Sequence, residues 1–271
     1  MILAVSSMVV LRVLGTAQDG GIPHLNCSCQ NCSSLTRHIS SIAIQGEQTI
    51  VIDATPDFTR QVRLLDPPTL ASVSAIFLTH LHIGHYTGLL QLGREVASTT
   101  DFPLYLIPAF QDFLTTNKPF SYLFSRKQVA IRDMQPEQPV AFSDFHITAF
   151  EVPHRNEDGI TLGYEIQTPD TLAIYLPDID YLPDRINKRL QTADLVLFDG
   201  TFYSSQEIGH QQHVPHPPIV DTLASYHRPE SQQFVFTHFN HSNPILADPS
   251  LQQQLLDQGF DLAEDKQVFQ L

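Results

Sequence analysis

The sequence predicts an α/β protein built as an αββα sandwich, in which two packed mixed β-sheets are flanked by helices. Short apolar or alternating runs typical of strands occur in both halves of the 271-residue chain, and segments with helical spacing accompany them. Elements of this kind are stable as layers around a shared core. Because no Gly/Ser linker, low-complexity run or internal repeat divides the chain, we expect a single domain spanning residues 1–271.

The first third of the chain is rich in expected strands. They are Val9–Leu14, Ser41–Ile44, Thr49–Ile52 and Ala75–Leu78. Gly46 and its polar neighbours indicate a hairpin turn between the second and the third of these strands. Apolar residues at helical spacing then predict a helix over Thr87–Ala97.

The remainder of the chain repeats this alternation. Further strands are expected at Pro103–Ile107, Phe145–Val152, Thr161–Ile166, Leu172–Leu176, Leu195–Phe198 and Phe234–Thr237. Helices are expected at Arg185–Gln191, Pro217–His227 and Pro249–Gln258. The phenylalanine-rich segment Pro108–Phe124 is interpreted as a helical insertion within the domain.

Polar residues follow six of the expected strands, near the point where each strand ends. They are Asp53, His80, His154, Asp178, Asp199 and His238. Functional residues concentrate where the ends of strands converge on one rim of a scaffold. We therefore expect these six side chains to share one site.

Three histidines, His80, His82 and His85, lie between a buried strand and an expected helix. Alternate residues of an extended turn point the same way, so His80 and His82 can share one metal ion while His85 faces a second position. Neutral imidazole is a common ligand of zinc, iron and related ions. The alternative is that these are surface or helix-capping histidines in a chain that contains 13 of them. The strand–turn–helix context favours a metal site.

The segment Thr79–Leu89 resembles the T-H-x-H-x-D-H-x-x-G signature of the metallo-β-lactamase superfamily, and the resemblance extends over almost the whole chain because later ligands occur in the family's order. The ligands that it implies are His80, His82 and His154 for a first metal, His85 and His238 for a second, and Asp178 as a bridge between them. The resemblance thus implies one or two active-site divalent ions, which would be zinc, manganese or iron.

Gly84 departs from that signature, which has an aspartate ligand at this position. Because glycine offers no ligand atom, we expect the second metal site to be weak, water-filled or empty. An alternative interpretation is a decayed and inactive site. Every other ligand position is retained, which favours a working metal centre.

The three cysteines of the chain, Cys27, Cys29 and Cys32, form one tight cluster. An odd, closely spaced set is a poor disulfide framework and suits a closed tetrahedral zinc site, with three free thiols as the alternative. His38 and His241 are the candidates for the fourth ligand. His38 leads into an expected strand and is expected to point along it, so His241 is preferred.

A subgroup of the superfamily pairs such a cysteine turn with a His-x-x-His near the C-terminus, and the resemblance supports His241 as the ligand of this structural zinc. The subgroup includes pyrroloquinoline-quinone biosynthesis protein B and the phosphodiesterase of phosphonate utilisation. Gly15–Cys29 and Val214–Ile219 look most like the quinone-pathway protein. Those proteins often lack parts of the histidine motif that this chain retains.

Asp199 and His216 are candidates for an acid–base pair. The segment Leu195–Phe202 is similar to one in tRNA-processing phosphodiesterases, where an acidic residue pairs with a downstream histidine that serves the leaving group. A carboxylate that fixes the tautomer of an imidazole makes a usable general acid. The alternative is that Asp199 caps a loop and His216 packs beside Pro217. His210 and His213 are expected on an exposed glutamine-rich loop.

The leading functional hypothesis is hydrolysis of a small phosphodiester or related ester by a metal-activated water. A net charge of −14 argues against nonspecific binding to nucleic acid or to an anionic membrane. No apolar run reaches the ~20 residues that a membrane-spanning helix needs. The absence of a basic n-region argues against a signal peptide, so we expect a cytoplasmic protein whose native start is Met1 or Met8.

Two alternatives remain open. An iron-dependent oxygenase or hydroxylase in cofactor biosynthesis is compatible with a three-histidine site and a neighbouring carboxylate. A non-catalytic module that binds a small ligand and contains only structural zinc is the other. The partner is a small-molecule substrate in the first two cases, and a homodimer is compatible with the sequence without being indicated by it.

Overall fold

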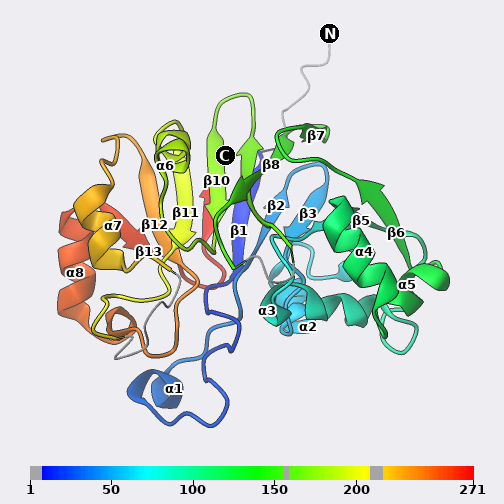
Figure 1. The fold of residues 1–271 in the computed structure, drawn as a ribbon, viewed down its shortest axis with the longest axis horizontal. Helices are drawn as coiled ribbons and strands as arrows, with labels where there is room; N and C mark the ends of the chain where they lie inside the picture. Colours follow the sequence, from blue (N-terminus) through cyan, green and yellow to red (C-terminus); the bar gives the residue numbers. More distant parts are fainter. Residues whose placement is uncertain (1–7, 156–158, 208–215) are drawn as a thin grey trace.

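The computed structural model describes residues 8–155, 159–207 and 216–271. Two seven-stranded β-sheets form the centre of the molecule, and helices lie outside them, as Figure 1 shows. The strand order is β14-β1-β2-β3-β4-β5-β6 in the first sheet and β13-β12-β11-β10-β9-β8-β7 in the second. Both sheets contain parallel and antiparallel pairs. The predicted αββα architecture with two mixed sheets is therefore confirmed.

The elements follow the chain in alternating groups. The strands of the first sheet are β1 (Val10–Gly15), β2 (Ser41–Gln45), β3 (Thr49–Ile52), β4 (Val73–Phe77), β5 (Phe102–Leu106), β6 (Val129–Asp133) and β14 (Val268–Gln270). Those of the second sheet are β7 (Pro139–Ala141), β8 (His146–Val152), β9 (Thr161–Gln167), β10 (Leu172–Leu176), β11 (Leu195–Asp199), β12 (Gln233–Thr237) and β13 (Phe260–Leu262). The α-helices are α1 (Gln30–Ser34), α2 (Phe58–Gln61), α3 (Ile83–Tyr86), α4 (Pro108–Thr116), α5 (Ser121–Ser125), α6 (Asp184–Leu190), α7 (Ile219–Ser225) and α8 (Pro249–Asp257).

The helices divide between the two sides of the molecule. Helices α6, α7 and α8 lie beside the second sheet, whereas α2 to α5 lie on the side of the first sheet (Figure 1). The segment that contains α1 projects away from the body of the molecule (Figure 1). Within the described residues, no helix is both long enough and apolar enough to cross a membrane.

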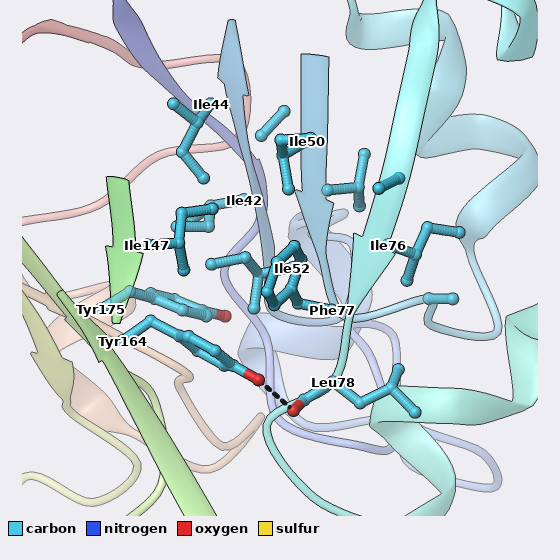
Figure 2. Packing of buried hydrophobic residues seen from close by; sticks show 14 of the residues in the cluster. Ile42, Ile44, Ile50, Ile52, Ile76, Phe77, Leu78, Ile147, Tyr164 and Tyr175 are labelled. Carbon is cyan, nitrogen blue, oxygen red and sulfur yellow. Dashed lines mark hydrogen bonds between the residues drawn. The ribbon is translucent and has the colours of Figure 1, made fainter. Parts of the chain in front are cut away.

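The main hydrophobic core lies between the two sheets. Figure 2 shows isoleucines of β2 and β3 facing Tyr164 of β9 and Tyr175 of β10 across this layer. The Tyr164 hydroxyl donates a hydrogen bond of 2.6 Å to the carbonyl of Leu78, directly after β4. Each fully buried large apolar side chain of this kind stabilises the fold by about 1.5–3 kcal/mol. The hydrogen bond fixes the end of β4, where the histidine cluster begins.

A second apolar cluster lies between the second sheet and its helices. In β10, Tyr175 faces the inter-sheet core, whereas Ile174 and Leu176 belong to the cluster that contains Leu190 of α6 and Leu255 of α8. Strands that are buried on both faces have continuous runs of apolar residues in their sequence, rather than apolar residues that alternate with polar ones. This explains why the apolar runs of β10, β11 and β12 could be predicted directly from the sequence.

The structure corrects two of the helix predictions. The helix expected over Thr87–Ala97 begins earlier, as α3, and continues as a 3₁₀ segment that ends at Leu92. Its backbone is pressed against a loop, since the Gly88 amide donates a 2.8 Å hydrogen bond to the carbonyl of Ala54. The helical insertion is present, but it is divided into α4 and α5. Pro119 lies between them and has no amide hydrogen with which to continue a helix.

Four strands were not predicted, and all four are sheet edges. Strands β14 and β6 flank the first sheet, and β13 and β7 flank the second. Three of them are only three residues long, and each exposes at least one side chain. Short and partly exposed edge strands have no sustained apolar pattern, so the sequence carries little signal for them.

Candidate metal centre

The six polar residues that follow predicted strands meet at one end of the two sheets. Parallel pairing of β3 with β4, and of β11 with both β10 and β12, brings the C-terminal ends of these strands together. The residues brought into this site are Asp53, His80, His82, His85, His154, Asp178, Asp199, His216 and His238. Three of them, Asp53, His216 and His238, adopt left-handed backbone conformations with φ of 72°, 96° and 63°. Such conformations persist where surrounding contacts enforce them, and they are common at functional sites.

One group of potential ligands consists of His80, His82 and His154, whose ligand atoms all lie within 4.8 Å of one another. Nε2 of His80 is 2.9 Å from Nδ1 of His82. Nδ1 of His154 is 2.9 Å from Oδ1 of Asp180, which leaves Nε2 for the centre of the group. Burial lowers the pKa of His80 well below its usual value and that of His154 to about 2. Both rings are therefore neutral, which is the form that binds metal.

His85 and His238 form a second group with Asp178. Nε2 of His85 and Nε2 of His238 lie 3.3 Å and 3.2 Å from Oδ2 of Asp178. The other nitrogen of each ring makes a hydrogen bond: Nδ1 of His85 with the Asp53 carboxylate, and Nδ1 of His238 with the Thr201 hydroxyl at 2.9 Å. Partners of this kind fix the tautomer and orientation of metal-binding imidazoles.

Asp178 lies between the two groups, as a bridging ligand would. Its Oδ1 is 3.6 Å from Nε2 of His154, whereas its Oδ2 faces His85 and His238. Burial raises the pKa of this carboxyl to about 8. Among the described residues, Oδ2 of Asp178 and Nε2 of His238 are buried and make no hydrogen bond. A buried carboxylate surrounded by imidazole nitrogens fits a divalent cation. Such a cation would bind Oδ2 of Asp178 and Nε2 of His238, and its positive charge would keep the Asp178 carboxyl ionised despite its burial.

Asp19 is the residue that sequence reasoning missed. It lies in the loop after β1, and its Oδ1 is 3.1 Å from Nε2 of His85 and 3.9 Å from Nε2 of His238. Although burial raises its pKa, the hydrogen bond and the charge of His85 dominate and hold the pKa of Asp19 well below its usual value. Asp19 lies four residues beyond the end of β1, farther from its strand than the six site residues expected from the sequence, so its position gave no comparable signal. Asp180 and the positioning role of Asp53 were also not anticipated.

The cysteine cluster forms a separate site in the projecting segment. Cys27, Cys29, Cys32 and His241 lie together, and Nδ1 of His241 is 3.4 Å from Sγ of Cys27 and 3.6 Å from Sγ of Cys29. In a tetrahedral zinc site with ordinary Zn–S and Zn–N bond lengths, the N···S edge is roughly 3.6 Å. The hydrogen bond from His241 lowers the pKa of the Cys29 thiol to about 6, which favours the thiolate that binds metal. The arrangement fits a structural zinc ion.

His38, the other candidate for that fourth ligand, points elsewhere. Its Nδ1 lies 3.0 Å from Oδ2 of Asp265, in the C-terminal part of the chain. Asp265 also accepts hydrogen bonds from the His38 amide and from the Thr16 hydroxyl. His38 therefore connects the N-terminal and C-terminal segments, and the preference for His241 agrees with the geometry.

Asp199 and His216 form a close pair beside the histidine groups. Nδ1 of His216 is 2.7 Å from Oδ2 of Asp199, and both side chains are buried. Asp199 also accepts hydrogen bonds from the amides of Ile179 and Thr201, which fix its orientation. Burial lowers the pKa of His216, but the Asp199 carboxylate outweighs it, so that the net shift is upward. Val214, His210 and His213 lie outside the described residues.

A family model described as a beta-lactamase superfamily domain matches residues 48–239, which include both histidine groups and the Asp199–His216 pair. The chain therefore belongs to the beta-lactamase superfamily, and its fold is the metallo-β-lactamase fold.

Within that superfamily, the chain is similar to proteins named coenzyme PQQ synthesis protein B. The protein from Cupriavidus necator is 29% identical over 95% of this chain and 98% of its own length. The protein from Ruegeria pomeroyi is also 29% identical, over 93% of this chain and 97% of its own length. These similarities agree with the resemblance inferred from the N-terminal segment.

Two solved structures share the fold over nearly the whole chain. The zinc-bound PqqB from Methylobacterium extorquens has a TM-score of 0.81 at 24% identity and covers 97% of this chain and 100% of its own. A diphosphatase of the PhnP family has a TM-score of 0.77 at 23% identity and covers 97% of each chain. At these identities, the likeness establishes the fold alone.

Proposed function

We propose that this protein is a metal-dependent hydrolase that acts on a small phosphodiester or a related ester. The observation that carries the proposal is the convergence of two groups of histidines on one buried carboxylate, Asp178, beside the Asp199–His216 pair. The first group, His80, His82 and His154, would hold one divalent ion, and Asp178 would bridge to a second. When bound, such ions supply Lewis-acid chemistry that lowers the pKa of water and neutralises charge developing on a phosphoryl oxygen.

His216 is the group in this chain that can serve the leaving group. Its Nδ1 is bound to Asp199, which leaves Nε2 as the nitrogen available for proton transfer. The adjacent carboxylate raises the pKa of His216 and so favours the protonated ring, which is the form that can donate. A positioned general acid contributes about 10²- to 10⁴-fold to the rate, and most where the leaving group is a poor one.

Arg155 supports an anionic substrate. It lines a small recess together with His80 and His82. A guanidinium placed there can bind the phosphoryl oxygens that face the metal centre, because its planar fork matches phosphate geometry. The chain as a whole is strongly acidic, with a net charge of −14, and would repel a long nucleic acid, so this local cation suits a small anionic substrate. Three free thiols arranged as a metal site are consistent with a cytoplasmic location.

Hydrolysis of a bis-nitrophenyl phosphodiester by protein loaded with Mn²⁺ or Zn²⁺ tests the proposal. His82→Ala should abolish turnover, whereas His146→Ala, at an exposed position on β8, should not change it. His216→Gln should slow an alkyl ester with a poor leaving group far more than the activated nitrophenyl ester. Unchanged turnover in His82→Ala would refute the proposal. Binding of a single zinc equivalent at the cysteines, without turnover of any ester, would instead indicate a non-catalytic ligand-binding module.

The relatives favour one second candidate. Proteins named for PQQ synthesis match this chain over most of its length, which suggests a step in the biosynthesis of a quinone cofactor. A three-histidine site with a neighbouring carboxylate also suits Fe(II) in an oxygenase. Tightly bound iron with consumption of O₂, in protein purified without chelators, would favour this candidate over hydrolysis.

A further inference from the structure

Gly84, which lacks the ligand expected from the family signature, lies directly against Asp19. A Cβ atom added at Gly84 would overlap with Oδ1 of Asp19 and come within 2.8 Å of both Cα and Cγ of Asp19. Real Cβ atoms essentially never make contacts this short, so a side chain at position 84 and the present position of Asp19 exclude one another. The space next to the backbone of residue 84 is already filled by a carboxylate, which comes from a distant part of the chain.

The donor atoms around this carboxylate have the spacing of a metal site. Nε2 of His85 is 3.1 Å from Oδ1 of Asp19 and 3.3 Å from Oδ2 of Asp178. Nε2 of His238 is 3.9 Å and 3.2 Å from the same two oxygens. A tetrahedral ion with N and O ligands at ordinary bond lengths has N···O edges of roughly 3.4 Å. The ligand atoms of Asp19, His85 and His238 all lie within 4.8 Å of one another, and Asp178 contacts both histidine nitrogens.

The loop that carries Asp19 is fastened to the strand end that carries His238. The Gln18 amide donates a 2.9 Å hydrogen bond to the carbonyl of Phe239, and the Phe239 amide donates a 2.7 Å hydrogen bond to Thr16. Phe239 directly follows His238, so the backbone fixes Asp19 and His238 relative to each other. Because the position of Asp19 is fixed by backbone pairing, little conformational entropy would be lost when it binds a ligand.

We propose that Asp19 replaces the carboxylate missing at Gly84 and completes a second divalent-metal site with His85, His238 and Asp178. Mixed nitrogen and carboxylate ligands of this kind suit Zn²⁺ or Mn²⁺. This site differs from the weak or empty second site that Gly84 alone implies. The inference about Asp19 rests on the proposed metal-dependent function, and it is tested by measuring metal binding directly.

The experiment measures Zn²⁺ and Mn²⁺ binding to the full chain after chelator treatment, by metal analysis and titration, with each ion located by anomalous scattering. The wild type should hold an ion between His85, His238 and Asp19. Asp19→Asn should weaken this ion at least about 10-fold. Gly84→Ala should weaken it as well, because the added methyl group displaces the Asp19 carboxylate. The control Asp194→Asn, which changes a carboxylate on the surface, should bind like the wild type.

The inference fails if the wild type has no ion at this point, or if Asp19→Asn retains it with unchanged affinity. His82→Ala separates this result from the proposed function. Should His82→Ala lose a metal ion and turnover while Asp19→Asn behaves like the wild type, only the role of Asp19 is refuted. Should Asp19→Asn lose the second ion while the wild type turns over no ester, only the hydrolytic function is refuted.

Discussion

Nδ1 of His85 lies 2.8 Å from Oδ2 of Asp53, and both side chains are completely buried. The Asp53 carboxylate accepts a hydrogen bond from Nδ1–H of His85, so Nε2 is the nitrogen that faces Asp19 and Asp178 and would bind a metal ion in place of its proton. Asp53 is itself held by the amide and hydroxyl of Thr79, the residue that precedes the histidine cluster. One buried carboxylate therefore sets both the orientation and the tautomer of a candidate metal ligand.

Asp53→Asn should weaken metal binding at the group that contains His85 by about 10- to 100-fold, because the neutral amide no longer fixes the tautomer. Competition with a chromogenic chelator measures this affinity. Asp194→Asn provides the control for the change from carboxylate to amide. An unaltered affinity in Asp53→Asn would show that the ring of His85 is oriented without this carboxylate.

Tyr164→Phe should destabilise the protein by about 1–3 kcal/mol, because it removes the donor that satisfies the buried carbonyl of Leu78. The phenyl ring preserves the packing between the sheets shown in Figure 2. Urea denaturation measures the loss in the free energy of unfolding, and Tyr122→Phe, at an exposed position on α5, is the matched control. Equal stability of the two variants would contradict the importance assigned to this hydrogen bond.

Cys29→Ser should remove one equivalent of zinc and lower the melting temperature. The zinc site formed by the three cysteines and His241 joins the projecting segment to the loop after β12. The ion bound by His80, His82 and His154 should remain, because none of these ligands lies on that segment. Metal analysis and thermal denaturation report the two effects. Ser33→Ala, in the adjoining helix α1, should retain all metal, and retention of the zinc by Cys29→Ser would argue against a cysteine site.

The contribution of His38 to stability should depend on pH. The hydrogen bond and charge of Asp265 raise the pKa of His38 in the folded protein above its value in the unfolded chain, which is about 6.5. The stabilisation is fully present below the unfolded pKa and is lost as the pH rises through the folded pKa. His38→Gln should therefore cost more free energy of unfolding at about pH 5.5 than at about pH 9.

Denaturant unfolding of the wild type and of His38→Gln at both pH values measures that difference. His227→Gln, on the exposed surface, controls for the general effect of pH. A cost that is the same at both pH values would mean that the contact of His38 with Asp265 does not depend on the charge of the ring.

The sequence by itself determined the layered architecture and the central strands. Strands such as β10 and β12 are buried on both faces, so their apolar runs are continuous and can be recognised without knowledge of their partners. The sequence also indicated His80, His82 and His85 as neighbours, because only one or two residues separate consecutive histidines and restrict where their side chains can lie. The four edge strands were missed, since their pairing depends on neighbours that are distant along the chain.

Only the tertiary structure decided how Gly84 should be interpreted. In the sequence, Gly84 marks an absent ligand, because its local motif contains no carboxylate. In the folded chain, Asp19 lies in the space that a side chain at position 84 would need. Residues separated by more than sixty positions met there because the loop after β1 pairs with Phe239, beside His238. A ligand supplied through long-range backbone pairing leaves no local pattern in the sequence, whereas one supplied by the strand–turn–helix motif does.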